Sequence, residues 1–444
     1  MQWLERSTSI PIQARSVQDA STARKTRNNW FLYLFLFLLP LENIQTGHLP
    51  QIPGGINFLN VGFALSLIGA WYAGGKLVRW TGLYRWVWLY LGWSFVTLLI
   101  GLSLFPTPTD MLRFNALKDS IIGVLLLFIV QMSVTDWTSL KRVLLATFLS
   151  LPYILRVTHG EHSGVAHWHY SDKARISGSF TTIGSNEFAS FCVTSALVLC
   201  ALLIATKWPR RWRALLLVCI GCMLLSLLWT YSRTGYATIL IGGVCMMLLW
   251  RGRKKMVLPV IFGLLIVPSF LPNAVVERFD STHLEGPQSD VSTQMRYVFW
   301  DVAWEHFQMH PLVGTGYRTF ADYNPYKMDT HNFFVRELVE KGAIGFLIVV
   351  GLFLSMARAC WRCMRDSPPG SLAYALGLGM CAAWVALVIA NIWGDRFTYS
   401  QMIGYFWVYL ALVLKAREFA LAENPPVTTP ARPSAQRRRE LKHA

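Results

Sequence analysis

Twelve apolar runs of about 16 to 23 residues constrain the fold of this chain more than any other feature. A helix needs roughly 20 mostly apolar residues to cross the hydrocarbon core of a bilayer. Two of the runs are weaker than the others, because 141–157 contains Arg142 and Pro152 and 235–250 is short. The pattern predicts an all-α polytopic membrane protein with about 12 transmembrane helices, over residues 30–46, 56–74, 85–105, 112–133, 141–157, 186–206, 213–231, 235–250, 256–271, 340–358, 371–393 and 399–416.

The charge of the chain supports a membrane protein and excludes an ordinary soluble enzyme. Only 15% of the 444 residues are charged, whereas about 25% is usual for a soluble domain. The formal net charge of +17 would favour a nucleic-acid partner only if the positive residues shared one exposed face. When the N-terminus is placed inside, 28 of the 41 Lys and Arg residues fall in inner segments, but only 7 of the 24 acidic residues do. The excess of +21 on the inner face predicts that both termini are cytoplasmic.

The spans divide the chain into five parts. These are a basic N-terminal segment (1–29), nine transmembrane helices (30–271), a long outer loop (272–339), three further transmembrane helices (340–417) and a disordered cytoplasmic tail (418–444). All eight cysteines lie in spans or at the cytoplasmic edge, so no disulfide framework is predicted. Because loops on a rigid scaffold carry most functional sites, we expect function on the outer face.

The long outer loop is predicted to contain an amphipathic helix over 291–309. Arg296 falls on its apolar face, beside Phe299 and Trp300. A guanidinium group among aromatic residues has three interpretations: it reaches lipid headgroups, packs on a ring, or faces an anionic ligand in a cavity. The polar stripe on the other face consists of Gln294, Asp301, Glu305 and Gln308.

Two further residues are candidates for chemistry. Arg233 lies in a tight outer turn, where it is suited either to a lipid headgroup phosphate or to a pyrophosphate in the outer leaflet. His331 is expected in the first turn of a helix that Asp329 or Thr330 caps. The positive end of the helix dipole would keep the imidazole neutral and able to accept a proton, although a single histidine is also compatible with a structural role.

The other outer loop, Val157 to Gly184, holds four histidines and two basic residues. The histidines suggest either a metal site or a solvated polar loop, and their spacing matches no defined ligand motif. In chain order the six residues are His159, His162, His167, His169, Lys173 and Arg175.

Together these features resemble the O-antigen ligase family, within the wider group that includes O-antigen polymerases and protein O-oligosaccharyltransferases. The clearest match is His331-Asn332 followed, after nine residues, by Gly342-x-x-Gly345, which is the H-N-x9-G-x-x-G pattern of that family. The Gly184-Ser185 pair departs from the small-Pro pair that is usual in the family. Other matching positions are Arg233, Arg296, the segment 311–316 and the segment 175–186.

The resemblance implies a GT-C type enzyme of the bacterial (Gram-negative) inner membrane, with its catalytic loop in the periplasm. Such an enzyme transfers a glycan from undecaprenyl pyrophosphate to a hydroxyl group of the lipid A-core oligosaccharide, and it needs neither a metal nor another cofactor. Its partners would be these two substrates and the membrane lipids, with no nucleic acid. The implied catalytic residues are His331 as base and Arg233 and Arg296 as pyrophosphate clamp. Residues that would assist substrate binding are Arg175, Asn332, Lys173 and Arg113.

Three alternatives remain open. An O-antigen polymerase shares the topology and donor but uses a lipid-linked glycan as acceptor. Protein O-oligosaccharyltransferases usually carry additional C-terminal sequence that is absent after Arg417. A polysaccharide flippase would place ionisable residues along a path through the membrane, and in the spans only Lys118 and Asp119 form such a pair.

Overall fold

The computed structural model describes residues 27–41, 44, 58–79, 81–104, 106, 110–164, 175–252 and 291–423. Over this part of the chain every regular element is a helix, so each satisfies its backbone hydrogen bonds internally, as a bilayer requires. In chain order the helices are α1 (Trp30–Leu38), α3 (Phe58–Ala73), α4 (Thr81–Leu104), α5 (Asp110–Ser133), α6 (Trp137–Ser163), α7 (Ser185–Ala205), α8 (Arg210–Trp229), α9 (Arg233–Leu249), α12 (Val291–Met309), α13 (Phe320–Tyr323), α14 (Phe333–Asp366), α15 (Leu372–Ile392) and α16 (Ser400–Glu423).

The described helices agree with the predicted spans. Eleven of the twelve predicted runs overlap a described helix, although α1 ends at Leu38 within the run 30–46, and the run 256–271 lies outside the described residues. Seven helices, namely α4 to α8, α14 and α15, are long and apolar enough to cross a bilayer, and α3 and α9 are shorter apolar helices. The described part of the chain is therefore all-helical, and its apolar helices are those of a multi-pass membrane protein. The total of about 12 spans and the GT-C architecture stay predictions.

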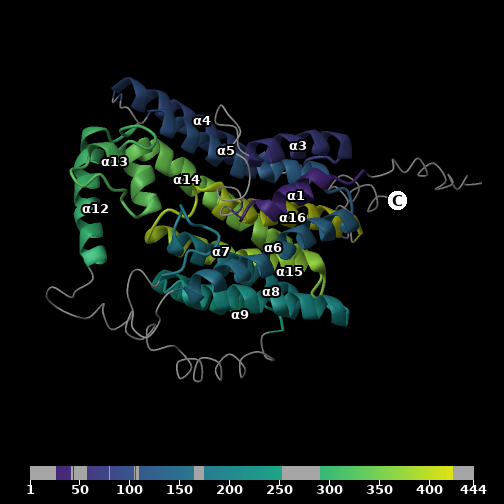
Figure 1. Ribbon diagram of the computed structural model, residues 1–444. Coiled ribbons are helices and arrows are strands. Elements are labelled where there is room, and N and C mark those ends of the chain that lie inside the picture. The colour runs from purple at the N-terminus through teal and green to yellow at the C-terminus, as the bar shows by residue number, and fades with distance from the viewer. Residues whose placement is uncertain are drawn as a thin grey trace, which may run out of the picture.

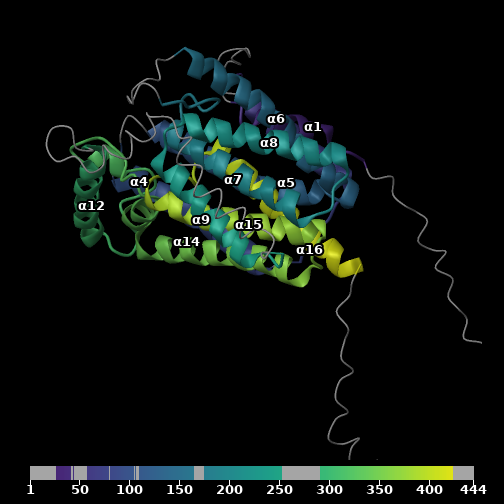
Figure 2. The same cartoon turned by 90° about the horizontal axis from the view of Figure 1, so that it is seen from below.

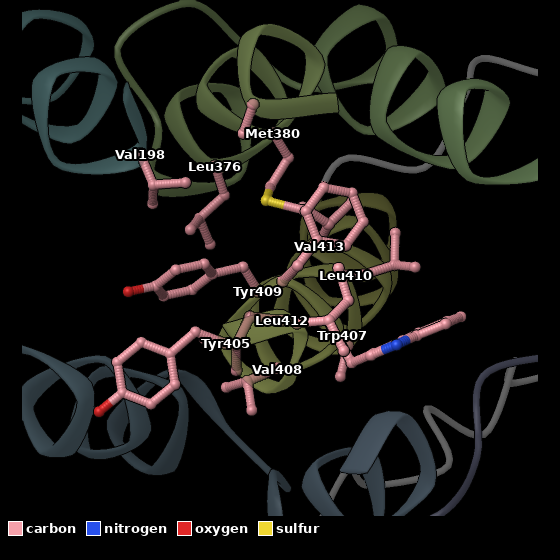
Figure 3. Packing of buried hydrophobic residues seen from close by; sticks show 14 of the residues in the cluster. Val198, Leu376, Met380, Tyr405, Trp407, Val408, Tyr409, Leu410, Leu412 and Val413 are labelled. Atoms are coloured by element: carbon pink, nitrogen blue, oxygen red, sulfur yellow. The ribbon is translucent and has the colours of Figure 1, made fainter. Parts of the chain in front are cut away.

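Helix α16 forms the centre of the bundle. Every residue from Tyr405 to Leu414 is at most 1% exposed, so this helix is apolar and buried on all sides. Figure 3 shows its side chains packed against Leu376 and Met380 of α15 and Val198 of α7. The helix continues to Glu423, beyond the predicted start of the tail at 418. Residues 424–444 lie outside the described part.

Helix α14 is broken at Gly342, the first glycine of the G-x-x-G motif. Gly342 has φ 65° and ψ −175° within an otherwise helical stretch. The segment before α13 packs into this break, where the Ala343 N–H donates to the Pro311 carbonyl (2.8 Å) and the Gly316 N–H donates to the Glu340 carbonyl (2.8 Å). A side chain at Gly342 would place its Cβ 2.2 Å from the Leu312 carbonyl oxygen. The motif therefore has a structural reason, since only glycine fits both this φ and this close approach.

Helix α12 does not run parallel to the long helices of the bundle. The two views agree that α12 lies across one end of the long helices, next to the start of α14 (Figures 1 and 2). This end also carries α13 and the His331 turn, and we call it the α12 end.

Candidate active site

Helix α12 forms one wall of the candidate site. The helix has the predicted bounds, and the four residues of its predicted polar stripe are exposed. Phe299 and Ala303, on the other face, are each 1% exposed. Arg296 is half-buried on this inner face, as predicted, and its Cζ lies 6.0 Å from the centre of the Trp393 ring. Two of the three interpretations of Arg296 are thus compatible with its position: packing on a ring and facing a ligand within the site.

His331 lies in the turn before α14, and this differs from the prediction. The cap of α14 is Asn332, whose side-chain oxygen accepts from the Phe334 N–H (2.9 Å) and the Val335 N–H (3.2 Å). The imidazole is therefore outside the first turn, because the capping residue is Asn332, directly after His331, instead of Asp329 or Thr330 before it. His331 has φ 52°, a conformation that costs a residue with a Cβ of the order of 1–3 kcal/mol.

The His331 turn is held from two directions. The Trp300 indole N–H of α12 donates to the Thr330 carbonyl (2.9 Å). The Phe333 N–H donates to the Gly394 carbonyl (3.1 Å), in the connection between α15 and α16. These two bonds on either side of His331 stabilise its strained backbone, and the centre of its ring lies 5.9 Å from the centre of the Phe299 ring.

The surroundings of His331 keep it neutral near pH 7. Burial lowers the pKa of His331, Asp329 opposes this effect, and the positive charges of Arg296 and Arg396 lower the pKa further. The lowered pKa favours the neutral form that the sequence predicts, but its causes are burial and two guanidinium groups instead of a helix dipole. A neutral imidazole beside fixed positive charges is suited to accept a proton.

A second group of residues lies where α7 and α9 begin. The Asn186 side-chain oxygen accepts hydrogen bonds from Arg175 (2.6 Å) and from the Ser232 hydroxyl (2.9 Å). Ser232 is the cap of α9, and Arg233 is the first residue of that helix. One amide, that of Asn186, thus connects Arg175, a predicted substrate-binding residue, with the residue before Arg233, a predicted catalytic residue.

Glu187 and Arg396 connect this group to His331. Glu187, adjacent to Asn186 in α7, forms an ion pair with Arg396. Arg396 is 2% exposed, and its charge acts on the imidazole of His331. The first turn of α7 therefore lies between the Arg233 turn and the His331 turn, and it places the predicted catalytic residues at the α12 end of the molecule.

A buried charged network adjoins the start of α14. Arg336 is 2% exposed and pairs with Asp395 and, at 3.4 Å, with Asp329. Glu337 and Lys341, each 1% exposed, pair at 2.7 Å. Although burial alone raises the pKa of Asp395, the charge of Arg336 keeps it well below its ordinary value. Buried charges need such partners, and the paired network fixes the position of α14 and of the turn before it.

Sequence analysis missed this network as well as Glu187 and Arg396. One signal was available: the order Arg-Glu-x-x-Glu-Lys over 336–341 places opposite charges four residues apart on one helix. Asp395 and Arg396 gave another signal, because they interrupt two apolar runs.

Arg113 and Asn332, two of the predicted substrate-binding residues, have structural partners. Arg113 is 2% exposed and pairs with Asp110 (3.1 Å) and Asp322 (2.5 Å), which ties α5 to the segment of α13. The side-chain oxygen of Asn332 caps α14. Lys173 lies outside the described residues. The roles of all three in substrate binding stay predictions.

The histidine loop is only partly described. α6 continues through Pro152 to Ser163, so His159 and His162 lie on a helix rather than in the predicted loop, while His167 and His169 are outside the described residues. The His162 ring stacks on Trp229 at 4.3 Å. Within the described residues, no group of three or more His, Cys, Asp or Glu side chains is arranged to hold a metal ion.

The fold and this site define a multi-pass membrane protein with histidine and arginine residues gathered at one end of its helical bundle. Residues 218–350 match the family model described as O-antigen ligase. The matched segment contains Arg233, Arg296, His331 and both glycines of the α14 motif. A comparison with curated proteins found no match. The resemblance is therefore confirmed for residues 218–350, the part of the chain that this family model matches; members of the family are membrane enzymes of the glycosyltransferase type.

Proposed function

We propose that the protein is an O-antigen ligase, which transfers a preassembled glycan from undecaprenyl pyrophosphate to a hydroxyl group of the lipid A-core oligosaccharide. The observation that carries this proposal is the shared surroundings of His331, Arg296 and Arg396, with the pKa of His331 lowered by burial and by both guanidinium groups. A proton acceptor beside fixed cations suits a transfer in which a hydroxyl group attacks and a pyrophosphate leaves.

The proposed reaction is a single inverting displacement. The neutral imidazole of His331 takes the proton of the acceptor hydroxyl group while the oxygen of that hydroxyl group forms a bond to the anomeric carbon of the donor. The bond from that carbon to the pyrophosphate oxygen breaks at the same time. Arg233 and Arg296 neutralise the charge that develops on the pyrophosphate, and guanidinium groups suit this role because they bind phosphate oxygens in pairs.

Other residues support these steps. Arg175 is bonded to the amide that also holds the Arg233 turn, so we assign it to phosphate binding. Asn332 caps α14 directly after His331, and we assign it a positioning role besides substrate contact. Lys173 and Arg113 complete the proposed substrate-binding set. The α12 end faces the periplasm in this proposal, with both termini in the cytoplasm.

The test is transfer in vitro from a defined undecaprenyl pyrophosphate glycan to purified core lipid. For His331→Ala we expect a rate lower by about 10²- to 10⁴-fold, because that is the usual contribution of a general base, with donor binding retained. The matched control is His159→Ala, on α6 and next to Trp229, which should transfer at the rate of the unmodified protein. Normal transfer by His331→Ala would contradict the assignment of the base.

A deletion strain separates ligase from polymerase. Lipopolysaccharide gels should show core without any O-chain if the protein is the ligase. Core carrying a single unit would instead indicate the polymerase, and an unchanged ladder would reject both.

A further inference from the structure

A cavity lined by arginines lies at the end of α14 far from His331. It has a volume of about 450 Å³ and opens between α4 and α14. Its basic side is formed by Arg79, Arg358, Arg362 and Arg417, and its apolar side includes Trp86 and Leu354. None of the described residues that line it is acidic. Polar and apolar surfaces are therefore separated within one cavity.

The two kinds of surface follow each other along α14. Gly351, Leu354, Arg358 and Arg362 recur at helical spacing and line the same cavity. From Gly351 to Arg362 the helix rises by about 16 Å. Leu354 is 60% exposed, as expected for a side chain that faces lipid. The cavity thus changes from apolar to cationic over a length comparable to a phospholipid headgroup and the first part of its acyl chains.

The walls of the cavity are held in place. A Cβ at Gly351 would lie 2.5 Å from the Trp86 ring, so α4 and α14 are in close contact at the apolar end. Arg79 follows a turn that is fixed by bonds from the Gly75 N–H to the Met132 carbonyl (2.9 Å) and from the Val78 N–H to Gln131 (3.2 Å).

The charge at the cationic end is only partly compensated. Arg417 pairs with Asp366 at 2.7 Å, while Arg79 and Arg358 are exposed. Among the described residues, these guanidinium groups together with the Asp366 carboxylate carry a net positive charge, which favours an anionic ligand.

We propose that this cavity binds an anionic phospholipid of the leaflet opposite the candidate active site. The phosphate lies between Arg79, Arg358 and Arg362, and the acyl chains follow Leu354 and Trp86. Paired donors of guanidinium groups match phosphate oxygens, and basic pockets between transmembrane helices are suited to such headgroups. The apolar half of the cavity favours a lipid over a free phosphate ion. This site is separate from the proposed transfer reaction, and its test does not depend on that reaction.

The experiment measures lipid binding to the purified full-length protein by native mass spectrometry, with added cardiolipin, phosphatidylglycerol or phosphatidylcholine. The unmodified protein should retain the two anionic lipids in preference to phosphatidylcholine. The triple variant Arg79→Gln, Arg358→Gln, Arg362→Gln should bind them about tenfold or more weakly, since each surface cation contributes to the attraction. The matched control is Arg210→Gln, Arg211→Gln, Arg213→Gln, three exposed arginines at the start of α8, which should leave binding unchanged.

A second variant keeps every charge. Leu354→Trp fills the apolar half of the cavity at an exposed position, so it should weaken lipid binding without disturbing the fold. Equal binding by the first triple variant and its control, or no preference for anionic lipids, would overturn the proposal. Complete displacement of the lipid by millimolar inorganic phosphate would also overturn it, because the site would then be one for a free anion.

Discussion

At the scale of single residues, positive φ values gather around the candidate site. Among the described residues the non-glycine positions with positive φ are Tyr231, Arg318, Lys327 and His331. Tyr231 directly precedes the cap of α9, and His331 directly precedes the cap of α14. Such conformations persist only where neighbouring contacts enforce them, and they are common at functional sites. The two helix starts are therefore built to hold Arg233 and His331 in defined places.

The pKa of His331 predicts the pH dependence of transfer. Burial and the nearby arginines lower this pKa below its ordinary value of about 6.5. Only the neutral imidazole accepts a proton, so kcat/KM should be constant near pH 7 and should fall at acidic pH, below 6.5. In Asp329→Asn the carboxylate that raises the pKa is absent, and the acidic limb should move to lower pH. A limb that stays in place or moves upward would contradict this assignment.

The proposed arginine clamp predicts that lysine cannot replace arginine at position 296 without loss of activity. Arg296→Lys keeps the charge but loses the paired donors of the guanidinium group. We expect kcat lower by about 10²-fold, comparable to the loss of one transition-state donor, as measured in the transfer assay.

The same transfer assay on the unmodified protein with added EDTA should show full activity. Loss of activity that one divalent ion restores would favour the histidine loop and a metal mechanism instead.

At the scale of elements, α14 joins the site to the membrane bundle through its break. The first part of the helix, up to Lys341, carries the buried charged network, and the part after Gly342 continues to Asp366. The broken backbone is paired with the 311–316 segment. The Trp93 indole N–H also donates to the Lys341 carbonyl (2.9 Å). The two parts of the H-N-x9-G-x-x-G pattern therefore have different structural roles: Asn332 of H-N caps α14, and Gly342 of G-x-x-G allows two segments to meet.

The break predicts a large stability difference between two glycine substitutions. Gly342→Ala would combine a positive φ with a Cβ 2.2 Å from a carbonyl oxygen, and we expect a loss of about 3 kcal/mol or more. Gly221→Ala, in α8, has open space around its Cβ and should be neutral or slightly stabilising, since alanine favours a helix. Thermal unfolding of the two purified variants measures this, and equal melting temperatures would contradict it.

At the scale of the whole molecule, the arginine-lined cavity and the candidate active site lie at opposite ends of α14. The excess of positive residues in the predicted inner segments predicts the orientation of the chain. At the α12 end (Figures 1 and 2), Arg296 lies on α12 and His331 directly precedes the cap of α14. The arginine cavity lies at the other end of α14. Substrate chemistry and anionic lipid binding would thus take place in different leaflets.

This orientation predicts the location of the C-terminus. A fluorescent protein fused after Ala444 should fluoresce, because it would fold in the cytoplasm, whereas alkaline phosphatase at the same position should be inactive. Active alkaline phosphatase would invert the topology and would place the site on the cytoplasmic side.

The sequence by itself determined the helices and several of their faces. Runs of apolar residues and 3.6-residue periodicity are local properties, so they located eleven described helices, the bounds of α12 and the inner face that carries Arg296. Because such patterns are local, the sequence did not reveal contacts between distant residues. Glu187 and Arg396 are 209 residues apart, and only the packing of α7 beside the connection between α15 and α16 brings them together. The position of His331 before its helix is also local, because the cap is Asn332. Only the tertiary structure decided that burial and two arginines lower the pKa of His331, because these contacts join segments that the order of residues does not bring together.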